Sequence, residues 1–311
     1  MPFMAVKWIP KRLVELSLIN VAAHTGQLLV DTCEQEYRQR IAAAADQLLA
    51  SGRHLVMLTG PSSSGKTTTA HKLAEELRRR NTVAEVISLD DFFLDLEKYP
   101  RLPDGSKDYE NVAALDIPLV NACLNEVVTT GSTRLPQFDF ITEHRKAELR
   151  PISIGDGVLI VEGIHAHNPC LTSQLPGDRV YRLYAGLREE YAFCGQRILP
   201  TRDIRLARRM VRDHAHRGHS PLKTLQMWPQ VCAGEDRYIK VFKPQADALL
   251  DTSFSYEVEC LAPRVRALAQ QFDDGSQQAQ TLKALADRFA LCDTPLEQLL
   301  WPDSMLQEFL G

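Results

Sequence analysis

The residues from Gly60 to Thr67 read GPSSSGKT and satisfy the pattern GxxxxGK[ST] without a mismatch. They directly follow an apolar run, Leu55 to Thr59, and open a segment whose leucines have helical spacing. Glycines in such a loop permit turns that point backbone N–H groups at a phosphate, and the helix N-terminus adds partial positive charge. The alternative, a surface turn rich in Ser and Gly, does not require this strand and helix context.

Two side chains of the loop have specific expected tasks. Lys66 would reach the terminal phosphates of a nucleoside triphosphate, and the Thr67 hydroxyl would help to hold Mg²⁺. The loop therefore predicts an ATP site with Mg²⁺ as its metal. The loop residues expected to contact the nucleotide are Gly60, Ser62, Ser63, Ser64, Gly65, Lys66, Thr67 and Thr68.

Acidic residues follow two further apolar runs. Glu162 ends the run Val158 to Val161 in VLIVEGIH, and Asp90 and Asp91 follow the run in ISLDDFF. The carboxyl ends of parallel strands meet at one sheet edge, so these acids are expected beside the phosphate loop. Glu162 would then lie on the metal side, and one of the two aspartates could accept the proton of an attacking hydroxyl. The alternatives are a capping or salt-bridged role for Glu162 and turn formation for either aspartate.

A basic segment, TRDIRLARRMVRDHAHRGHS, follows later in the chain. Its arginines at 205, 208, 209 and 212 share one face at helical spacing. A solvated face is the usual meaning of a charge run, but this chain is net acidic at −4. We expect a lid that closes on polyphosphate, because guanidinium groups stabilise the charge of phosphoryl transfer. The segment has no aromatic stacking platform for a nucleic-acid strand.

Composition excludes several other classes of protein. The 311 residues are 44% hydrophobic and 24% charged, as in globular chains rather than disordered ones. The longest apolar stretches are far shorter than the roughly 20 residues of a membrane helix, and the start lacks the pattern of a secretory signal. Seven scattered cysteines without a CxxC pair suggest reduced thiols. We expect a cytoplasmic protein without a membrane or nucleic-acid partner.

The apolar patterns alternate along the chain and predict an α/β fold of the P-loop NTPase type, with a parallel sheet flanked by helices on both faces. Residues 90–157 form a long polar excursion, expected to be a functional insertion, and the lid is expected at about 200–220. The expected strands are 55–59, 83–89, 158–161, 180–184 and 248–250, and the expected helices include 34–50 and 66–80. The expected organisation is a partly helical segment 1–50, a kinase-type domain 51–260 and a helical extension 261–311, with interruptions near 273–276 and 293–295.

Several ordered motifs together resemble the uridine kinase branch of the phosphoribulokinase and uridine kinase family. They are GPSSSGKTT, SLDDFF, YENVAALD, LPQFDF followed by HRK, VEGIH and RDIRLARRMVRDHAHRG. The resemblance runs from about residue 55 to 260, and the ending WPDSMLQEFLG looks like the end of longer bacterial proteins of this kind. It implies ATP-dependent phosphorylation of a nucleoside 5′-hydroxyl, and related kinases are often homo-oligomers.

The resemblance also implies roles for individual residues. Asp90 matches the catalytic base, Glu162 the acidic residue near Mg²⁺, and Arg205, Arg208 and Arg209 fall on the lid. The expected acceptor-binding residues are Glu110, Phe138, Glu143 and His144.

The acceptor positions depart from the usual family pattern. Glu110 lies where an aspartate for the sugar hydroxyls is usual, and Phe138 lies where a tyrosine is common. Glu143 falls near a base-reading histidine, a role that neighbouring His144 could fill. Other acceptors, such as a sugar-like or vitamin-like alcohol, therefore stay open. A non-catalytic ATP-gated switch is a further alternative, although a switch needs no base such as Asp90.

Overall fold

The computed structural model describes residues 9–140, 142–292 and 294–311. Its centre is a five-stranded sheet in which every neighbouring pair of strands is parallel. In sheet order the strands are β12 (Ala248–Asp251), β9 (Val180–Gly186), β2 (Leu55–Thr59), β8 (Val158–Glu162) and β3 (Ala84–Ser88). The predicted strands are confirmed to within two residues at each end.

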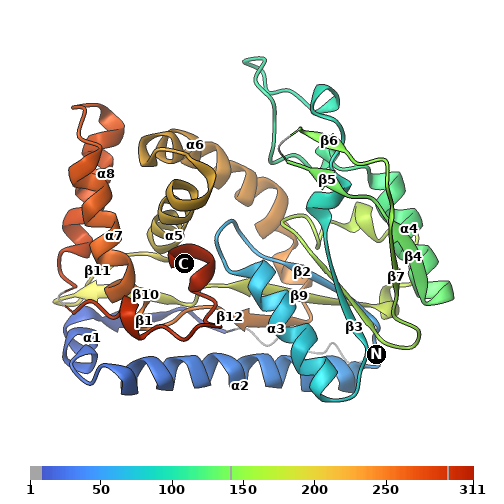
Figure 1. The fold of residues 1–311 in the computed structure, drawn as a ribbon, viewed down its shortest axis with the longest axis horizontal. Helices are drawn as coiled ribbons and strands as arrows, with labels where there is room; N and C mark the ends of the chain where they lie inside the picture. Colours follow the sequence, from blue (N-terminus) through green and yellow to red (C-terminus); the bar gives the residue numbers. More distant parts are fainter. Residues whose placement is uncertain (1–8, 141, 293) are drawn as a thin grey trace.

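Both faces of this sheet are buried, which explains its continuous apolar strands. Along β2, Val56 and Leu58 belong to one hydrophobic core, whereas Leu55 and Met57 belong to the other. This alternation follows from the two-residue period of a strand. The first core is covered by α2 (Gln27–Ser51), α3 (Lys66–Arg79) and the C-terminal helices, and the second by α4 (Ile117–Thr130). The predicted fold class is therefore confirmed (Figure 1).

The segment 90–157 contains more regular structure than the sequence suggested. It includes α4, two short antiparallel pairs and several 3₁₀ turns, so the expectation of one long polar excursion was wrong in this respect. Asp116 caps α4 by accepting a hydrogen bond from the Leu119 N–H at 3.1 Å. Because α4 contains several β-branched residues, its sequence resembles that of a strand or loop more than that of a helix. The two pairs are β4 (Ser132–Leu135) with β7 (Arg150–Ser153) and β5 (Phe138–Asp139) with β6 (His144–Arg145).

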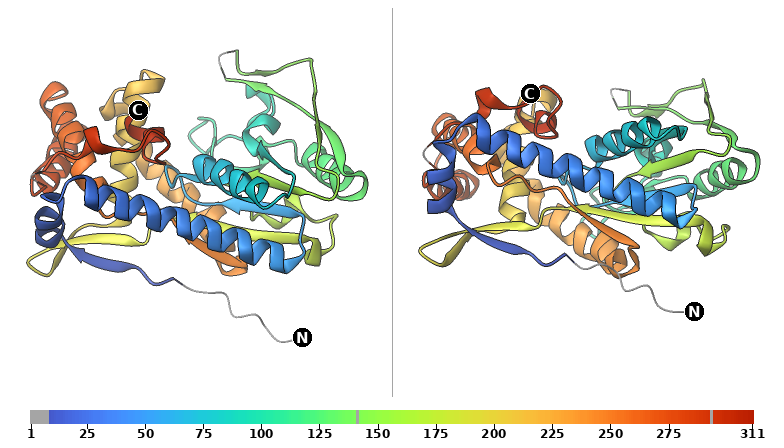
Figure 2. Two further views of the ribbon diagram at one scale, coloured as in Figure 1. Left: turned by 60° about the horizontal axis from the view of Figure 1, so that its bottom comes forward. Right: turned by 90° about the horizontal axis from the view of Figure 1, so that it is seen from below.

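A second, smaller sheet joins the N-terminal region to the middle of the chain. In it β1 (Arg12–Glu15) pairs in parallel with β10 (Glu189–Phe193), and β10 pairs with β11 (Gln196–Leu199). These three strands were not predicted from the sequence. The helix expected at 34–50 is confirmed, although α2 begins earlier, and α1 (Leu16–Ala23) precedes it. Figure 2 shows α2 running along the length of the main sheet.

The C-terminal third is mainly helical. Its helices are α5 (Thr201–Arg217), α6 (Pro221–Gly234), α7 (Glu257–Gln271), α8 (Gln277–Phe289) and α9 (Gln307–Leu310). The expected interruption at 273–276 separates α7 from α8, Asp293 lies outside the described residues, and residue 260 lies inside α7. Within the described chain, no helix has the length and apolar composition needed to cross a membrane.

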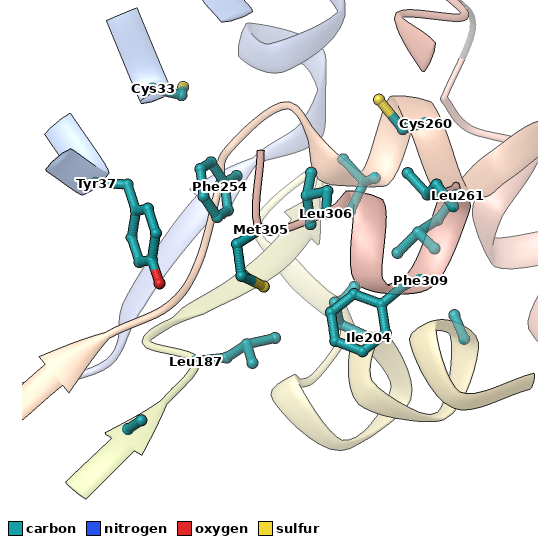
Figure 3. Packing of buried hydrophobic residues seen from close by; sticks show 14 of the residues in the cluster. Cys33, Tyr37, Leu187, Ile204, Phe254, Cys260, Leu261, Met305, Leu306 and Phe309 are labelled. Carbon is teal, nitrogen blue, oxygen red and sulfur yellow. The ribbon is translucent and has the colours of Figure 1, made fainter. Parts of the chain in front are cut away.

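The last residues pack into the main core rather than extending from it. Met305, Leu306 and Phe309 are each 1% exposed or less and belong to the same core as the sheet. Figure 3 shows them beside Ile204 of α5 and Phe254, which follows β12. The C-terminus is thereby held near the start of α3, where the phosphate loop ends.

Candidate active site

The phosphate loop connects β2 to α3, as its motif predicts. At Gly60 a side chain would overlap the Ala185 carbonyl oxygen, so only glycine fits. Gly65 has a φ of +80°, a left-handed conformation that favours glycine, and it directly precedes Lys66 at the start of α3. Glycine at these two positions therefore allows the loop to adopt its conformation.

A cavity of about 230 Å³ lies over this loop, and we call it the phosphate-loop cavity. It brings together loop residues, the ends of β3 and β8, and the second half of α5. The charged residues that line it are Lys66, Asp90, Glu110, Glu162, Arg209, Arg212, Arg217 and Glu308. Ser62, Ser63, Gly65 and Thr67 also line it.

Ser88 connects the two acids at the sheet edge. Its hydroxyl donates to Glu162 Oε1 at 2.8 Å and accepts from the Asp90 N–H at 3.3 Å. Burial raises the pKa of Glu162 to about 7, with the Asp90 charge adding to the rise and Lys66 opposing it. Burial likewise raises the pKa of Asp90, and Lys66 opposes that rise. Asp90 is itself exposed and lines the cavity, so a ligand in the cavity can reach it.

Asp91 points away from these groups. Its Oδ1 accepts a hydrogen bond from the Phe138 N–H at 3.4 Å, so it supports the insertion. Asp91 is not among the lining residues of the phosphate-loop cavity, whereas Asp90 is. The two neighbouring carboxylates therefore have different surroundings, and only the first faces the phosphate loop.

Lys66 is surrounded by the groups that its task requires. Its ammonium donates to the Pro61 carbonyl oxygen at 3.2 Å. Burial lowers its pKa, and the charges of Glu162, Glu308 and Asp90 oppose that change. The Lys66 ammonium is thus bonded to the loop itself and lies in the field of three carboxylates, near the place where phosphates are expected.

The stripe arginines of α5, at 205, 208, 209 and 212, are packed inward and do not form a solvated face. Arg205 is 3% exposed, pairs with Glu235 and donates to the Ser62 carbonyl oxygen at 3.0 Å. Arg209 donates to Ser62 Oγ at 2.9 Å and lines the phosphate-loop cavity. Arg208 is fully buried, pairs with Glu257 at 2.7 Å and does not line that cavity. The expected stripe therefore divides among three environments.

Asp213 was missed as a site residue. It is 1% exposed and forms ion pairs with Arg209 at 3.3 Å, Arg212 at 2.8 Å and Arg217 at 3.5 Å. All three arginines line the phosphate-loop cavity. Its position four residues from both Arg209 and Arg217 on one helix was the available signal.

Only one of the expected acceptor residues reaches the cavity wall. Glu110 lines it, and burial raises the pKa of Glu110 to about 7, with Glu235 adding and Arg209 opposing. Phe138 is buried behind Phe93, with ring centroids 5.9 Å apart, and Phe93 lines the cavity. Glu143 and His144 are exposed and do not line it.

The C-terminal tail contributes a carboxylate that no local pattern indicated. Glu308 lines the phosphate-loop cavity, and its Oε2 accepts a hydrogen bond from Thr68 Oγ1 at 2.7 Å. Met305 lies against the loop, since a side-chain carbon at Gly65 would be 2.5 Å from its sulfur. The tail thus closes one side of the site.

The residues present fit a Mg²⁺ ion. Thr67 and Glu162 offer a hydroxyl and a carboxylate on the same cavity. The described residues hold no group of three or more His, Cys, Asp or Glu side chains placed as a complete metal cage. Mg²⁺ needs no such cage here, because it commonly combines one or two protein oxygens with substrate phosphates and water.

Comparison with known proteins agrees with this geometry. Residues 55–175 match the phosphoribulokinase / uridine kinase family. The match agrees with the resemblance seen in the motifs. It includes the phosphate loop, the two acids of the sheet edge and Glu110.

The similar proteins include several uridine kinases. The chain is 28% identical to the uridine kinase of Lactobacillus helveticus over 166 residues, covering 53% of this chain and 70% of that protein. It is 26% identical to the uridine kinase of Saccharomyces cerevisiae over 200 residues, covering 63% of this chain but only 36% of the yeast protein. A solved structure, a possible uridine kinase from Bacillus stearothermophilus, has a TM-score of 0.49 and 20% identity, covering 70% of this chain and all of that one.

Proposed function

We propose that this protein transfers the γ-phosphoryl group of ATP to the 5′-hydroxyl of a nucleoside, with Asp90 as the base. The observation that carries the proposal is a single cavity lined by Lys66, Glu162 and Asp90. A phosphate-binding cation, a metal-side acid and a base are the groups that this transfer needs in one place.

The reaction follows from these positions. Mg²⁺ held by Thr67 and Glu162 would offset the negative charge of the phosphates. Lys66 and Arg209 stabilise the transferred group from the loop and from α5. Asp90 accepts the hydroxyl proton while the new oxygen–phosphorus bond forms, and the bond from the γ-phosphorus to the bridging oxygen breaks to release ADP.

An aromatic cluster supports a nucleoside as the acceptor. Phe93 and Tyr109 line the phosphate-loop cavity, and Tyr99 lies between them with ring centroids 5.7 Å from each. Phe138 extends the cluster behind Phe93. Flat aromatic faces suit a nucleobase, and the Glu110 carboxylate accepts hydrogen bonds from sugar hydroxyls. A plain sugar would use the carboxylate but not the rings.

The proposal is tested by incubating the protein with ATP, Mg²⁺ and a panel of nucleosides, free sugars and vitamin-like alcohols. We expect nucleosides to stimulate ADP release and to yield a nucleoside 5′-monophosphate, identified by mass and by phosphorus NMR. Stimulation only by a sugar or vitamin-like alcohol would reassign the acceptor. Slow ADP release that no acceptor stimulates would support a switch instead. The need for Mg²⁺, the cytoplasmic location and a homo-oligomeric state stay predictions.

The variant Lys66→Ala tests whether the ADP released in this assay comes from turnover at the phosphate loop. We expect it to abolish the stimulated turnover, because it removes the charge that faces the terminal phosphates. Lys72→Ala is the matched control, since Lys72 lies on the same helix but pairs with Asp303 at the surface. Equal loss in both variants would indicate damage to α3 rather than to a phosphate site.

A further inference from the structure

A second cavity of about 560 Å³ is lined by Pro61 and the start of α5, which do not line the phosphate-loop cavity. It is bounded by the end of β9, the β10–β11 hairpin and the 3₁₀ segment Lys240–Gln245. In the described part of the chain, seven cationic side chains and three carboxylates line it. These residues are Lys11, Arg188, Arg197, Arg202, Arg205, Lys240, Lys243, Glu190, Asp203 and Asp236. We call this cavity the basic pocket.

The carboxylates of the basic pocket do not balance its cations. Glu190 is shared by Lys11 at 2.6 Å and Arg197 at 3.0 Å. Asp236 is likewise shared by Arg202 and Lys240, at 2.8 and 2.7 Å. The third carboxylate, Asp203, pairs with Arg288, which does not line the pocket. The pocket therefore keeps an excess of positive charge.

This excess is concentrated where water has limited access. Arg188 is 3% exposed, and Arg205 is equally buried but has its charge balanced by Glu235. Burial lowers the pKa of Lys243 to about 8, and the charges of Arg188, Lys11 and Lys240 lower it further. Like charges gathered in a partly desolvated cavity are unfavourable, and a bound anion would offset that cost.

The start of α5 adds partial positive charge to the basic pocket. Pro200 precedes this 17-residue helix and offers no side-chain cap, and Thr201 and Arg202 of its first turn line the basic pocket. The N-terminus of a helix carries partial positive charge and favours anions, above all phosphate groups.

From the cavity, the charge excess and the helix start together, we propose that the basic pocket binds a small molecule that carries two or more phosphate groups. Its volume lies within the range of roughly 300–1,000 Å³ of ligand sites. A single phosphate brings only about two negative charges, fewer than the surplus of four that the lining presents.

The basic pocket is an effector site rather than a second catalytic centre. Glu190 and Asp236 are held in ion pairs, so they are not placed as a base. Arg205 connects the pocket to the phosphate loop, because it lines the pocket and also donates to the Ser62 carbonyl oxygen. A bound anion therefore acts on a residue that touches the loop directly.

The test measures binding of pyrophosphate by calorimetry. It uses the full chain carrying Lys66→Ala, which weakens the phosphate-loop site as a competitor. In that background, Arg197→Gln/Lys240→Gln removes two charges from the basic pocket, and Glu190 and Asp236 each keep a second cation. The matched control is Lys72→Gln/Arg79→Gln, which removes two charges elsewhere and leaves Asp303 with Arg38 and Glu76 with Arg80.

We expect saturable binding of pyrophosphate, weakened at least about tenfold by the pocket variant and less than about twofold by the control. Circular dichroism and thermal melting verify that every variant is folded. Equal affinity in the pocket variant would place the anion at the phosphate loop and overturn the proposal, as would the absence of binding. ADP and a hexose bisphosphate, titrated in the same way, distinguish a nucleotide from a sugar phosphate as the natural source, and a preference for either supports the site.

Discussion

The two cavities of this protein, one lined by Pro61 and the other by Ser62 and Ser63, differ in the charge of their linings. Within the described residues, four cations and four carboxylates line the phosphate-loop cavity, whereas seven cations and three carboxylates line the basic pocket. Phosphoryl transfer needs acids for a metal and for a proton, as well as cations for phosphate. Holding an anion needs only the cations.

The pKa shifts report the same contrast. In the phosphate-loop cavity burial raises the pKa of Glu162 to about 7, and a neighbouring carboxylate adds to the rise. In the basic pocket burial lowers the pKa of Lys243 to about 8, and neighbouring cations add to that decrease. Glu162 and Lys243 are therefore each shifted towards the neutral form by burial and by neighbours of like charge.

Helix α5 contributes residues to both cavities. Its first turns bring Arg205 to the basic pocket, and its later turns bring Arg209 to the phosphate-loop cavity. Arg208, between these two, is buried against Glu257. Variants of α5 should accordingly have different effects at neighbouring positions.

The largest effect is expected at Arg208. Arg208→Ala leaves Glu257 buried without its partner and should lower the free energy of unfolding by about 3–5 kcal/mol. Arg209→Ala should leave stability nearly unchanged, because Asp213 keeps Arg212 and Arg217, but should lower kcat by about 10². Urea unfolding and steady-state kinetics measure both. A stable Arg208→Ala protein with a strongly reduced kcat would return Arg208 to the catalytic role predicted from the sequence.

The second effect concerns the pH dependence of acceptor binding. The pKa of Glu110 is raised to about 7, so its carboxylate form, which accepts hydrogen bonds, prevails above pH 7 and is lost below it. The KM for the acceptor should therefore rise about tenfold from pH 8 to pH 6. Glu162 titrates in the same range, so the assignment depends on Glu110→Gln. That variant should flatten the KM profile, and an unchanged profile would exclude Glu110.

A smaller effect is expected in the tail. Glu308 places a negative charge beside Thr68, where the phosphates of ATP would lie. Glu308→Gln should lower the KM for ATP by about three- to tenfold, because it removes a like charge. Asp303→Asn is the control, since it changes a tail carboxylate outside the cavity. A higher KM in Glu308→Gln would mean that the tail assists ATP binding.

The smallest effect is expected in the basic pocket and concerns the titration of Lys243. The pKa of Lys243 is lowered to about 8, so its charge is present at pH 7 and largely absent at pH 9. Sulfate keeps its charge over this range, and its affinity for the Lys66→Ala protein should fall about threefold. Among the described residues, the groups near Lys243 include Lys11, Arg188, Lys240 and Tyr184, and the pKa of Tyr184 is raised to about 12. Lys243→Arg should remove the pH dependence, and its persistence would assign the titration elsewhere.

The sequence predicted those features that depend on local signals. The phosphate loop, the apolar strands and the acids at the strand ends are each written in fewer than ten consecutive residues. The structure confirms the strands and the fold. It also gives Asp90 and Asp91 different surroundings, because only Asp90 lines the phosphate-loop cavity.

Other features depend on contacts that no local pattern encodes. Glu308 meets Thr68 from 240 residues away, and the basic pocket combines Lys11 with residues near 190, 200 and 240. The arginine stripe was visible, but adjacent residues on a helix diverge by about 100°, so Arg208 can enter the core while Arg209 reaches a cavity. The buried charge of Arg208 is paired with Glu257, a residue far along the chain.

The central claim, that Asp90 is a base aimed at an acceptor hydroxyl, is tested most directly by comparing Asp90→Asn with Asp91→Asn. Single-turnover phosphoryl transfer from ATP to the nucleoside is measured for both, together with the affinities for ATP and acceptor. We expect Asp90→Asn to bind both ligands but to transfer phosphate about 10² to 10⁴ times more slowly, and Asp91→Asn to stay near the wild-type rate. A severe Asp91→Asn with a mild Asp90→Asn, or two mild variants, would contradict the account.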